Sequence, residues 1–220
     1  RIFTRLQLEF KIVQANPGEM GGNRSEEFHV LAASGEDAIA YCEADGFAAN
    51  VETVTLAATT EQSNDGAADP ELLTTPDIRS IEELCAFLNV KPADCLKTLL
   101  VAGSDTPAVV LLLRGDHELN CIKAEAIEDI AKPLRMLSEA EIIAVTGCEP
   151  GFLGPIDLKI PVYADHSVAR LRNFVCGANK AGHHFRGVNW KHDFPLPQVA
   201  DLRNAVSGDP SPSGGGPLTI

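Results

Sequence analysis

Apolar positions recur from residue 80 onward with the periods of both helices and strands. Ser80-Ile81-Glu82-Glu83 has the form of a capping box, and the apolar residues that follow share one helical face, which predicts a helix here. A second capping box, 138–141, predicts a helix that ends at Gly147. The pattern also predicts a helix over about 120–130 and strands at 97–101, 108–113, 160–164 and 185–188. The predicted fold class is therefore α+β, or mixed α/β.

The first 55 residues follow a different pattern. Extended runs at 9–15, 27–32 and 38–42 follow a short amphipathic opening, but they lack a full set of strand partners, which predicts part of a larger domain. Residues 56–77 are small, polar and acidic without apolar spacing, so we expect a linker there. The last residues, 218–220, have the character of the start of another strand.

The net charge of −13 argues against a surface that coats nucleic acid generally, because phosphate binding needs clustered Lys and Arg. The charge is unevenly distributed, however. Residues 1–150 carry 11 basic and 26 acidic side chains, whereas residues 151–200 carry six basic and three acidic ones and four of the six histidines. We therefore expect a polyanionic partner to meet the 151–200 side first.

Cysteine spacing and hydropathy indicate a cytoplasmic protein. The six cysteines form no C-x-x-C pair and read as reduced thiols. The longest apolar run, 108–113, is too short to cross a bilayer, and the chain opens on Arg1 and Ile2 without the pattern of a signal peptide. The sequence also lacks a G-x-S-x-G elbow, an H-E-x-x-H motif and a cysteine pair with zinc spacing.

An ordered set of short segments carries a resemblance to a known family. KTLLV (97–101), RGDHELN (114–120), GFLGP (151–155), FVCGAN (174–179), GVNW (187–190) and ADLRNAVSGDPSPSG (200–214) occur in the order seen in bacterial-type prolyl-tRNA synthetases. The upstream stretch, which includes FAANVE at 47–52, is similar to strands of the catalytic domain of that family. One departure stands at 25–28, where the chain reads Ser-Glu-Glu-Phe and the family usually reads Ser-His-Glu-Phe.

The resemblance implies a division of the chain. It assigns 1–55 and 198–220 to a class II catalytic domain with an antiparallel sheet, 56–77 to a linker, and 78–197 to the inserted, YbaK-like editing domain. Motifs 1, 2 and 3 of the catalytic domain are absent, so we expect no prolyl-adenylate synthesis by this chain. ATP and magnesium are expected for the parent synthetase alone, which the resemblance implies to be a homodimer, and no cofactor is expected for editing.

The implied activity is the hydrolysis of tRNA(Pro) mischarged at its 3′ end with alanine. A pocket built for proline rejects a smaller amino acid by only about 1–3 kcal/mol per missing methylene, so a second site that admits alanine is needed. The resemblance matches Lys97 to an essential lysine that binds phosphate or carbonyl oxygens. The resemblance also implies no metal and no protein nucleophile. Water is the implied attacking group, assisted by a ribose hydroxyl of the tRNA. From residues alone, Lys97 could equally be a lysine at a solvent-exposed strand end.

The same resemblance assigns the loop that contains Gly151, Gly154 and Pro155. Its glycines permit unusual backbone angles and would expose N–H groups toward a developing oxyanion. An ordinary Gly/Pro turn is the alternative.

Three further positions are implied to bind substrate. His183 and His184 are adjacent, so on a strand only one of them can face a given pocket, and the resemblance selects His184 to shape the amino-acid pocket. Asp165 is expected to bind the α-ammonium group, with a turn-capping aspartate as its alternative. Arg114 is expected to line the site. A non-catalytic insert that braces the synthetase or helps to hold tRNA remains the alternative for the whole domain; it predicts that Lys97, the 151–155 loop and His184 do not share a cavity.

Overall fold

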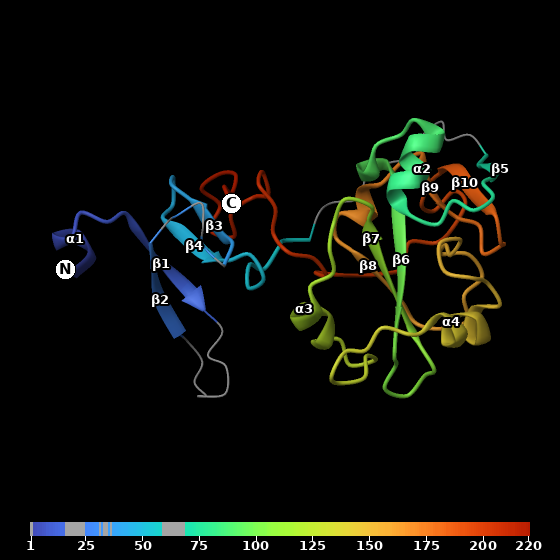
Figure 1. The fold of residues 1–220 in the computed structure, drawn as a ribbon, viewed down its shortest axis with the longest axis horizontal. Helices are drawn as coiled ribbons and strands as arrows, with labels where there is room; N and C mark the ends of the chain where they lie inside the picture. Colours follow the sequence, from blue (N-terminus) through green and yellow to red (C-terminus); the bar gives the residue numbers. More distant parts are fainter. Residues whose placement is uncertain (1, 16–24, 31, 33–34, 36, 59–68) are drawn as a thin grey trace. The chain divides into compact units, whose positions relative to one another are not determined.

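The computed structural model describes residues 2–15, 25–30, 32, 35, 37–58 and 69–220 and divides the chain into two compact units. The first combines Arg1–Ala57 with Asn204–Ile220, and the second is Ala58–Arg203. Both ends of the second unit therefore join the first (Figure 1). No helix in the described part of the chain has the length and apolar content to cross a membrane.

The main sheet of the second unit has the strand order β11-β8-β7-β6. Strands β6 (Leu96–Val101) and β7 (Val109–Arg114) form an antiparallel hairpin in which Lys97 faces Leu113 across the ladder. Strands β8 (Val162–Asp165) and β11 (Gln198–Ala200) continue the sheet in parallel. Because β7 is central and buried on both faces, its sequence is a continuous apolar run rather than an alternating one.

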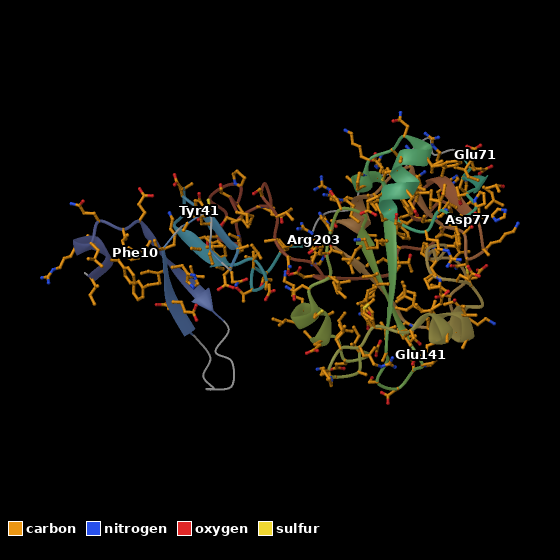
Figure 2. The ribbon with its side chains drawn as sticks, viewed as in Figure 1. Phe10, Tyr41, Glu71, Asp77, Glu141 and Arg203 are labelled. Carbon is orange, nitrogen blue, oxygen red and sulfur yellow. The ribbon has the colours of Figure 1, made fainter. Side chains whose placement is uncertain are left out.

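Alternate residues of the hairpin pack into two separate cores. Leu96, Leu100, Val110 and Leu112 belong to a cluster that includes Phe152, Phe174 and Trp190, and their odd-numbered neighbours Val101, Val109, Leu111 and Leu113 belong to a second cluster with Ala124, Ile130 and Leu202. Figure 2 shows side chains filling the space on both sides of these strands. This follows from the two-residue period of a strand.

A smaller antiparallel sheet has the order β5-β10-β9. Its strands are β5 (Glu71–Thr74), β10 (His183–Val188) and β9 (Phe174–Gly177), and they lie beside helix α2 in Figure 1. His184 sits in the centre of this sheet, opposite Leu73 on one side and Gly177 on the other.

Local capping fixes the ends of the helices. Helix α2 (Ile81–Leu88) and helix α4 (Glu139–Thr146) both begin with the expected capping boxes, at Ser80 and Ser138, and α4 ends at Gly147 with a left-handed φ of 73°. Helix α3 (Cys121–Glu125) is capped by the Asn120 side chain and is shorter than the predicted 120–130. Two short 3₁₀ helices, η2 (Pro92–Asp94) and η3 (Val168–Arg170), complete the unit.

The first unit contains helix α1 (Ile2–Arg5) and a four-stranded sheet of order β2-β1-β4-β3. Its strands are β1 (Phe10–Ala15), β2 (Ser25–Val30), β3 (Ile39–Cys42) and β4 (Phe47–Asn50). The antiparallel pairing expected here holds for the two outer pairs, whereas β1 and β4 are parallel. The predicted strand start at 218–220 is a single bridge between Thr219 and Tyr41.

Part of the expected linker is folded. Residues 71–74, within the expected linker 56–77, form β5 and pair with β10, while residues 59–68 of that stretch lie outside the described part of the chain. The compact second unit, Ala58–Arg203, includes the 78–197 expected for the inserted domain. Strand β5 lies at a sheet edge and is mostly exposed, so its sequence carries no apolar alternation. Strands β9 and β11 were likewise not predicted, because each is only three or four residues long.

Truncating a core side chain of the hairpin should destabilise the second unit strongly. Leu112→Ala removes a fully buried side chain, so we expect a loss of about 2–5 kcal/mol in the free energy of unfolding. Ile143→Ala on the exposed side of α4 should cost less than about 1 kcal/mol. Urea unfolding followed by the fluorescence of Trp190, the single tryptophan, reports on this unit; equal losses in the two variants would refute the expectation.

Candidate functional site

A cavity of about 310 Å³ lies beside β6, an outer strand of the main sheet. Its lining comes from residues around the start of α2 (79–81 and Leu84), from β6 (96–100), from Met136 and Ile142, from Pro150, Gly151 and Leu153, and from Gly177 and His184 of the smaller sheet. Most of this lining is apolar, and its polar groups come from segments that are far apart in the sequence. Such a concave, mainly apolar site with a few converging polar groups is typical of small-ligand binding.

His184 is fixed in the wall of this cavity by two hydrogen bonds. Its side chain is buried, its Nε2 lies 3.1 Å from the Gly151 carbonyl oxygen, and its Nδ1 lies 2.7 Å from Thr75 Oγ1. Since a carbonyl oxygen only accepts, Nε2 carries the proton and Nδ1 accepts from the Thr75 hydroxyl. Burial lowers the pKa of His184, and the bond to Gly151 partly offsets this effect. The imidazole is thus neutral and has no nitrogen left to act as a base.

The neighbouring His183 faces away, as the strand period predicts. Its Nδ1 lies 2.8 Å from the Ala181 carbonyl oxygen, and its side chain is more exposed than that of His184. The structure therefore brings His184, and not His183, to the cavity.

Lys97 lies on the edge strand, where it lines the cavity and is half-buried. Its ammonium nitrogen donates a hydrogen bond of 2.9 Å to the carbonyl oxygen of His117, which follows the end of β7. An ammonium group has three donors, so this bond leaves two for another acceptor. The lysine is therefore held by the protein rather than extended freely into solvent.

The 151–155 loop is packed too closely for side chains. Gly151 has a left-handed φ of 95°, and a Cβ on it would lie 2.8 Å from the Arg79 Cα. A Cβ on Gly154 would overlap the Gly177 carbonyl oxygen, and one on Gly177 would overlap the Leu153 carbonyl oxygen. Asn179 ties the loop down, because its side chain accepts from Gly154 N at 2.7 Å and donates to Gly154 O at 3.2 Å.

These contacts correct the expectation for Gly154. Its N–H is bonded to Asn179 and does not face an anionic centre, so Gly154 serves close packing. Pro155 is half-buried and does not line the cavity. Within the part of the chain that the structure describes, the backbone N–H groups of Gly151 and Leu153, both in the cavity wall, have no protein acceptor. They are the loop donors that could meet a ligand.

Asp165 and Arg114 do not line the cavity, contrary to their expected roles in binding substrate. Asp165 ends β8 and is 1% exposed; it accepts hydrogen bonds from Ser167 N, Ser167 Oγ and Leu202 N. Arg114 ends β7 and makes a two-pronged ion pair with Asp116, at 2.6 and 2.9 Å. Both side chains lie where strands of the main sheet end, and their polar groups are already bonded to neighbouring protein groups.

The structure adds two residues that sequence reasoning missed. Thr75 is fully buried and orients His184, but the two are 109 residues apart and no local pattern connects them. Arg79 lines the cavity next to the helix cap Ser80; its guanidinium lies 2.5 Å from Glu149 and 5.7 Å from the centre of the Phe152 ring. Its position directly before a capping box was the one sequence signal that could have placed it at a helix start.

The chemistry of the site is carried by side chains and backbone groups. In the described ranges, between 2 and 58 and from 69 to 220, no three His, Cys, Asp or Glu side chains are grouped to hold a metal ion. The lining provides one hydrogen-bonded ammonium, one arginine, two backbone donors and a neutral imidazole around a mainly apolar space. The donors among these groups can bind an anionic or carbonyl oxygen.

Comparison with known proteins gives a family match and a shared fold. Residues 75–194, more than half of the chain, match the family model described as the aminoacyl-tRNA editing domain. The matched segment contains every cavity residue from Arg79 to His184.

The structure is also similar to solved structures at 20–21% identity, which shows the shared fold. One is described as a candidate trans-editing enzyme for prolyl tRNA synthetase, with a TM-score of 0.51 over 62% of this chain and 87% of that chain. Another is a scaffold protein from computational grafting of an epitope backbone, with a TM-score of 0.51 over 62% and 88%. A third, a hypothetical protein, has a TM-score of 0.50 over 61% and 91%.

Two buried histidines should make the protein less stable in mild acid. Burial lowers the pKa of His117 to about 4 and also lowers that of His184, whereas both titrate near 6.5 when unfolded. The unfolded chain therefore binds more protons as pH falls below about 6.5, so these groups reduce stability between about pH 6.5 and pH 4. Imidazole NMR signals should show His117 neutral at pH 6 and His184 titrating below the usual 6.5; signals of both rings that titrate near 6.5 would contradict this.

Proposed function

Because this chain belongs to the aminoacyl-tRNA editing domain family, we propose that it hydrolyses the ester of mischarged tRNA(Pro) carrying alanine. The observation that supports the proposal is the convergence of Lys97, Gly151 and His184 on one cavity, although these residues lie up to 87 positions apart. The alternative of a non-catalytic brace predicted that these segments would not share a cavity.

We assign the cavity to a small amino acid rather than to proline. Its lining includes Leu84, Leu96, Leu100 and Leu153, and two hydrogen bonds hold His184 in the same lining. A buried imidazole fixed on both nitrogens cannot swing aside for a larger side chain without breaking a hydrogen bond. A site of this kind acts as a second sieve, because it admits the smaller amino acid and excludes the correct one.

The proposed mechanism uses water as the attacking group. Lys97 directs its two remaining donors at a phosphate or carbonyl oxygen of the terminal aminoacyl-adenosine, and the N–H groups of Gly151 and Leu153 stabilise charge that develops on the ester carbonyl. His184 does not remove a proton, since both nitrogens are engaged. A ribose hydroxyl of the tRNA assists the attack, and no cofactor or metal takes part.

We also propose that the chain belongs to a prolyl-tRNA synthetase. The segments 1–55 and 198–220 would then be parts of a class II catalytic domain, and the full protein would be a cytoplasmic, homodimeric ligase that uses ATP and magnesium. The order of family-like segments supports this assignment. The similar structure described as a trans-editing enzyme for prolyl tRNA synthetase is compatible with it.

Arg79 is proposed to bind a phosphate of the tRNA 3′ end. Its ion pair with Glu149 is half-exposed, with side chains 48% and 42% accessible, and exposed pairs contribute only about 0–1 kcal/mol. A phosphate can therefore displace the glutamate at low cost. The guanidinium also lies over the Phe152 ring, which packs edge-on against His184, and Arg79 and His184 line the same cavity.

Removing the ammonium of Lys97 should abolish editing without unfolding the protein. We expect Lys97→Ala to lower alanyl-tRNA(Pro) hydrolysis at least about 100-fold, since one preorganised donor is worth that much in comparable sites. Lys91→Ala, an exposed lysine outside the cavity, is the matched control and should retain wild-type turnover. Single-turnover deacylation of alanyl- and prolyl-tRNA(Pro) measures both; wild-type turnover in Lys97→Ala would favour a bracing role.

Removing the guanidinium of Arg79 should weaken tRNA binding more than chemistry. Arg79→Ala should raise KM, leave kcat nearly unchanged, and reduce the slope of log affinity against log salt by about 0.7, as expected for one lost contact to a single strand. Arg135→Ala breaks a comparable exposed pair with Glu141 that does not line the cavity. The same salt slope in Arg79→Ala and wild type would rule out the phosphate contact.

A further inference from the structure

A series of partly buried hydrogen bonds connects Asp165 to Lys97 through Ser167 and His117. The Asp165 carboxylate lies 2.6 Å from Ser167 Oγ, Ser167 Oγ lies 3.1 Å from His117 Nδ1, and the His117 carbonyl oxygen accepts the 2.9 Å bond from the Lys97 ammonium. Asp165 and His117 are 1% and 3% exposed. The groups thus form a continuous path from the end of β8 to the wall of the cavity.

The direction of each hydrogen bond in this chain can be assigned. Asp165 receives three donors, namely Ser167 N, Ser167 Oγ and Leu202 N, as a carboxylate does. The single hydroxyl proton of Ser167 therefore points to Asp165. His117 Nδ1 must then donate to Ser167 Oγ, which fixes the neutral tautomer protonated at Nδ1.

The surroundings of the second ring nitrogen of His117, Nε2, fit a residue that positions other groups. In the part of the chain that the structure describes, His117 Nε2 is buried and has no hydrogen-bond partner, and Asp116 Oδ1 is 3.8 Å away. It also lies outside the cavity lining, so it does not touch the proposed substrate. The side chain is connected to the rest of the protein through Ser167.

The backbone of His117 is held in place on both sides. Its N–H donates to the Arg114 carbonyl oxygen at 2.9 Å, and Gly115 N donates to the Cys95 carbonyl oxygen at 2.8 Å, next to the start of β6. A Cβ on Gly115 would lie 3.1 Å from Cys95 Cβ, so the turn after β7 is pressed against β6. Anchoring the imidazole completes this turn and fixes where the carbonyl oxygen points.

We propose that Asp165 and Ser167 are positioning residues that act through His117 to hold the Lys97 ammonium at the cavity. The inference rests on the proposed function of Lys97, and it replaces direct binding of the substrate α-ammonium as the role of Asp165. A lysine side chain has many rotamers, so an ammonium that is fixed before the substrate arrives loses less entropy on binding a substrate oxygen than a mobile one.

Ser167 is the residue to change. Asp165 also accepts from Leu202 N and pairs with Arg203, so replacing Asp165 would disturb more than the hydrogen bonds that lead to Lys97. We expect Ser167→Ala to lower kcat for alanyl-tRNA(Pro) about tenfold or more with little change in KM, as small displacements of a catalytic group do. Ser167→Thr keeps the hydroxyl and should restore turnover. Ser104→Ala, which removes a hydroxyl bonded to the Glu128 carbonyl far along the hairpin loop, is the control and should behave as wild type.

A spectroscopic measurement separates this proposal from the proposed function. The protons of the Lys97 ammonium, observed through its ¹⁵N signal, should exchange slowly with solvent in the wild type and in Ser167→Thr. They should exchange faster in Ser167→Ala. This measurement needs no turnover. A wild-type protein that fails to hydrolyse alanyl-tRNA(Pro) therefore refutes the editing assignment but does not contradict the hydrogen bonds from Asp165 to Lys97. An unchanged Lys97 signal in Ser167→Ala overturns the positioning proposal, whether or not turnover falls.

The wild-type protein provides a second test that does not depend on the folding of a variant. Imidazole ¹⁵N spectra at pH 7 should show His117 neutral and protonated at Nδ1. A neutral ring protonated at Nε2 would reverse the bond to Ser167 and overturn the proposal even if Ser167→Ala did not fold.

Discussion

The site depends on the imidazole of His184, which joins three segments that are distant in sequence. Thr75 precedes α2, Gly151 follows α4, and His184 lies on β10 and is hydrogen-bonded to both. Each hydrogen bond is worth about 1 kcal/mol, but leaving a buried nitrogen unpaired would cost about 1–3 kcal/mol. The cavity therefore keeps its shape, because separating these segments would leave a buried nitrogen of His184 unpaired at that larger cost in free energy.

Local chemistry was readable from the sequence, and long-range pairing was not. The capping boxes at Ser80 and Ser138 need residues only three positions apart, and the apolar run of β7 directly reflects burial on both faces. The alternation of His183 and His184 follows from the strand period alone. In contrast, β5 exists because β10 lies beside it, and nothing within the sequence of β5 signals that partner.

The functional residues show the same difference between local signals and long-range contacts. Lys97, Gly151 and His184 were identified by resemblance, and the structure brings them to one cavity. Asp165 was identified by the same means but ends a strand and binds protein groups, so the turn-capping alternative describes its contacts better. For Gly154, a motif cannot show whether a backbone N–H is free, because the acceptor on Asn179 comes from 25 residues away.

The interlocked glycines make one side of the cavity rigid and leave the other adjustable. Gly151, Gly154 and Gly177 leave no room for a methyl group, so no substitution there can reshape the space without moving backbone. The rest of the lining includes the side chains of Ile81, Leu84, Met136 and Ile142, whose volumes can change without moving backbone. Among proteins with this architecture, differences in amino-acid preference should therefore arise from substitutions at these side chains, while the glycine loop stays the same.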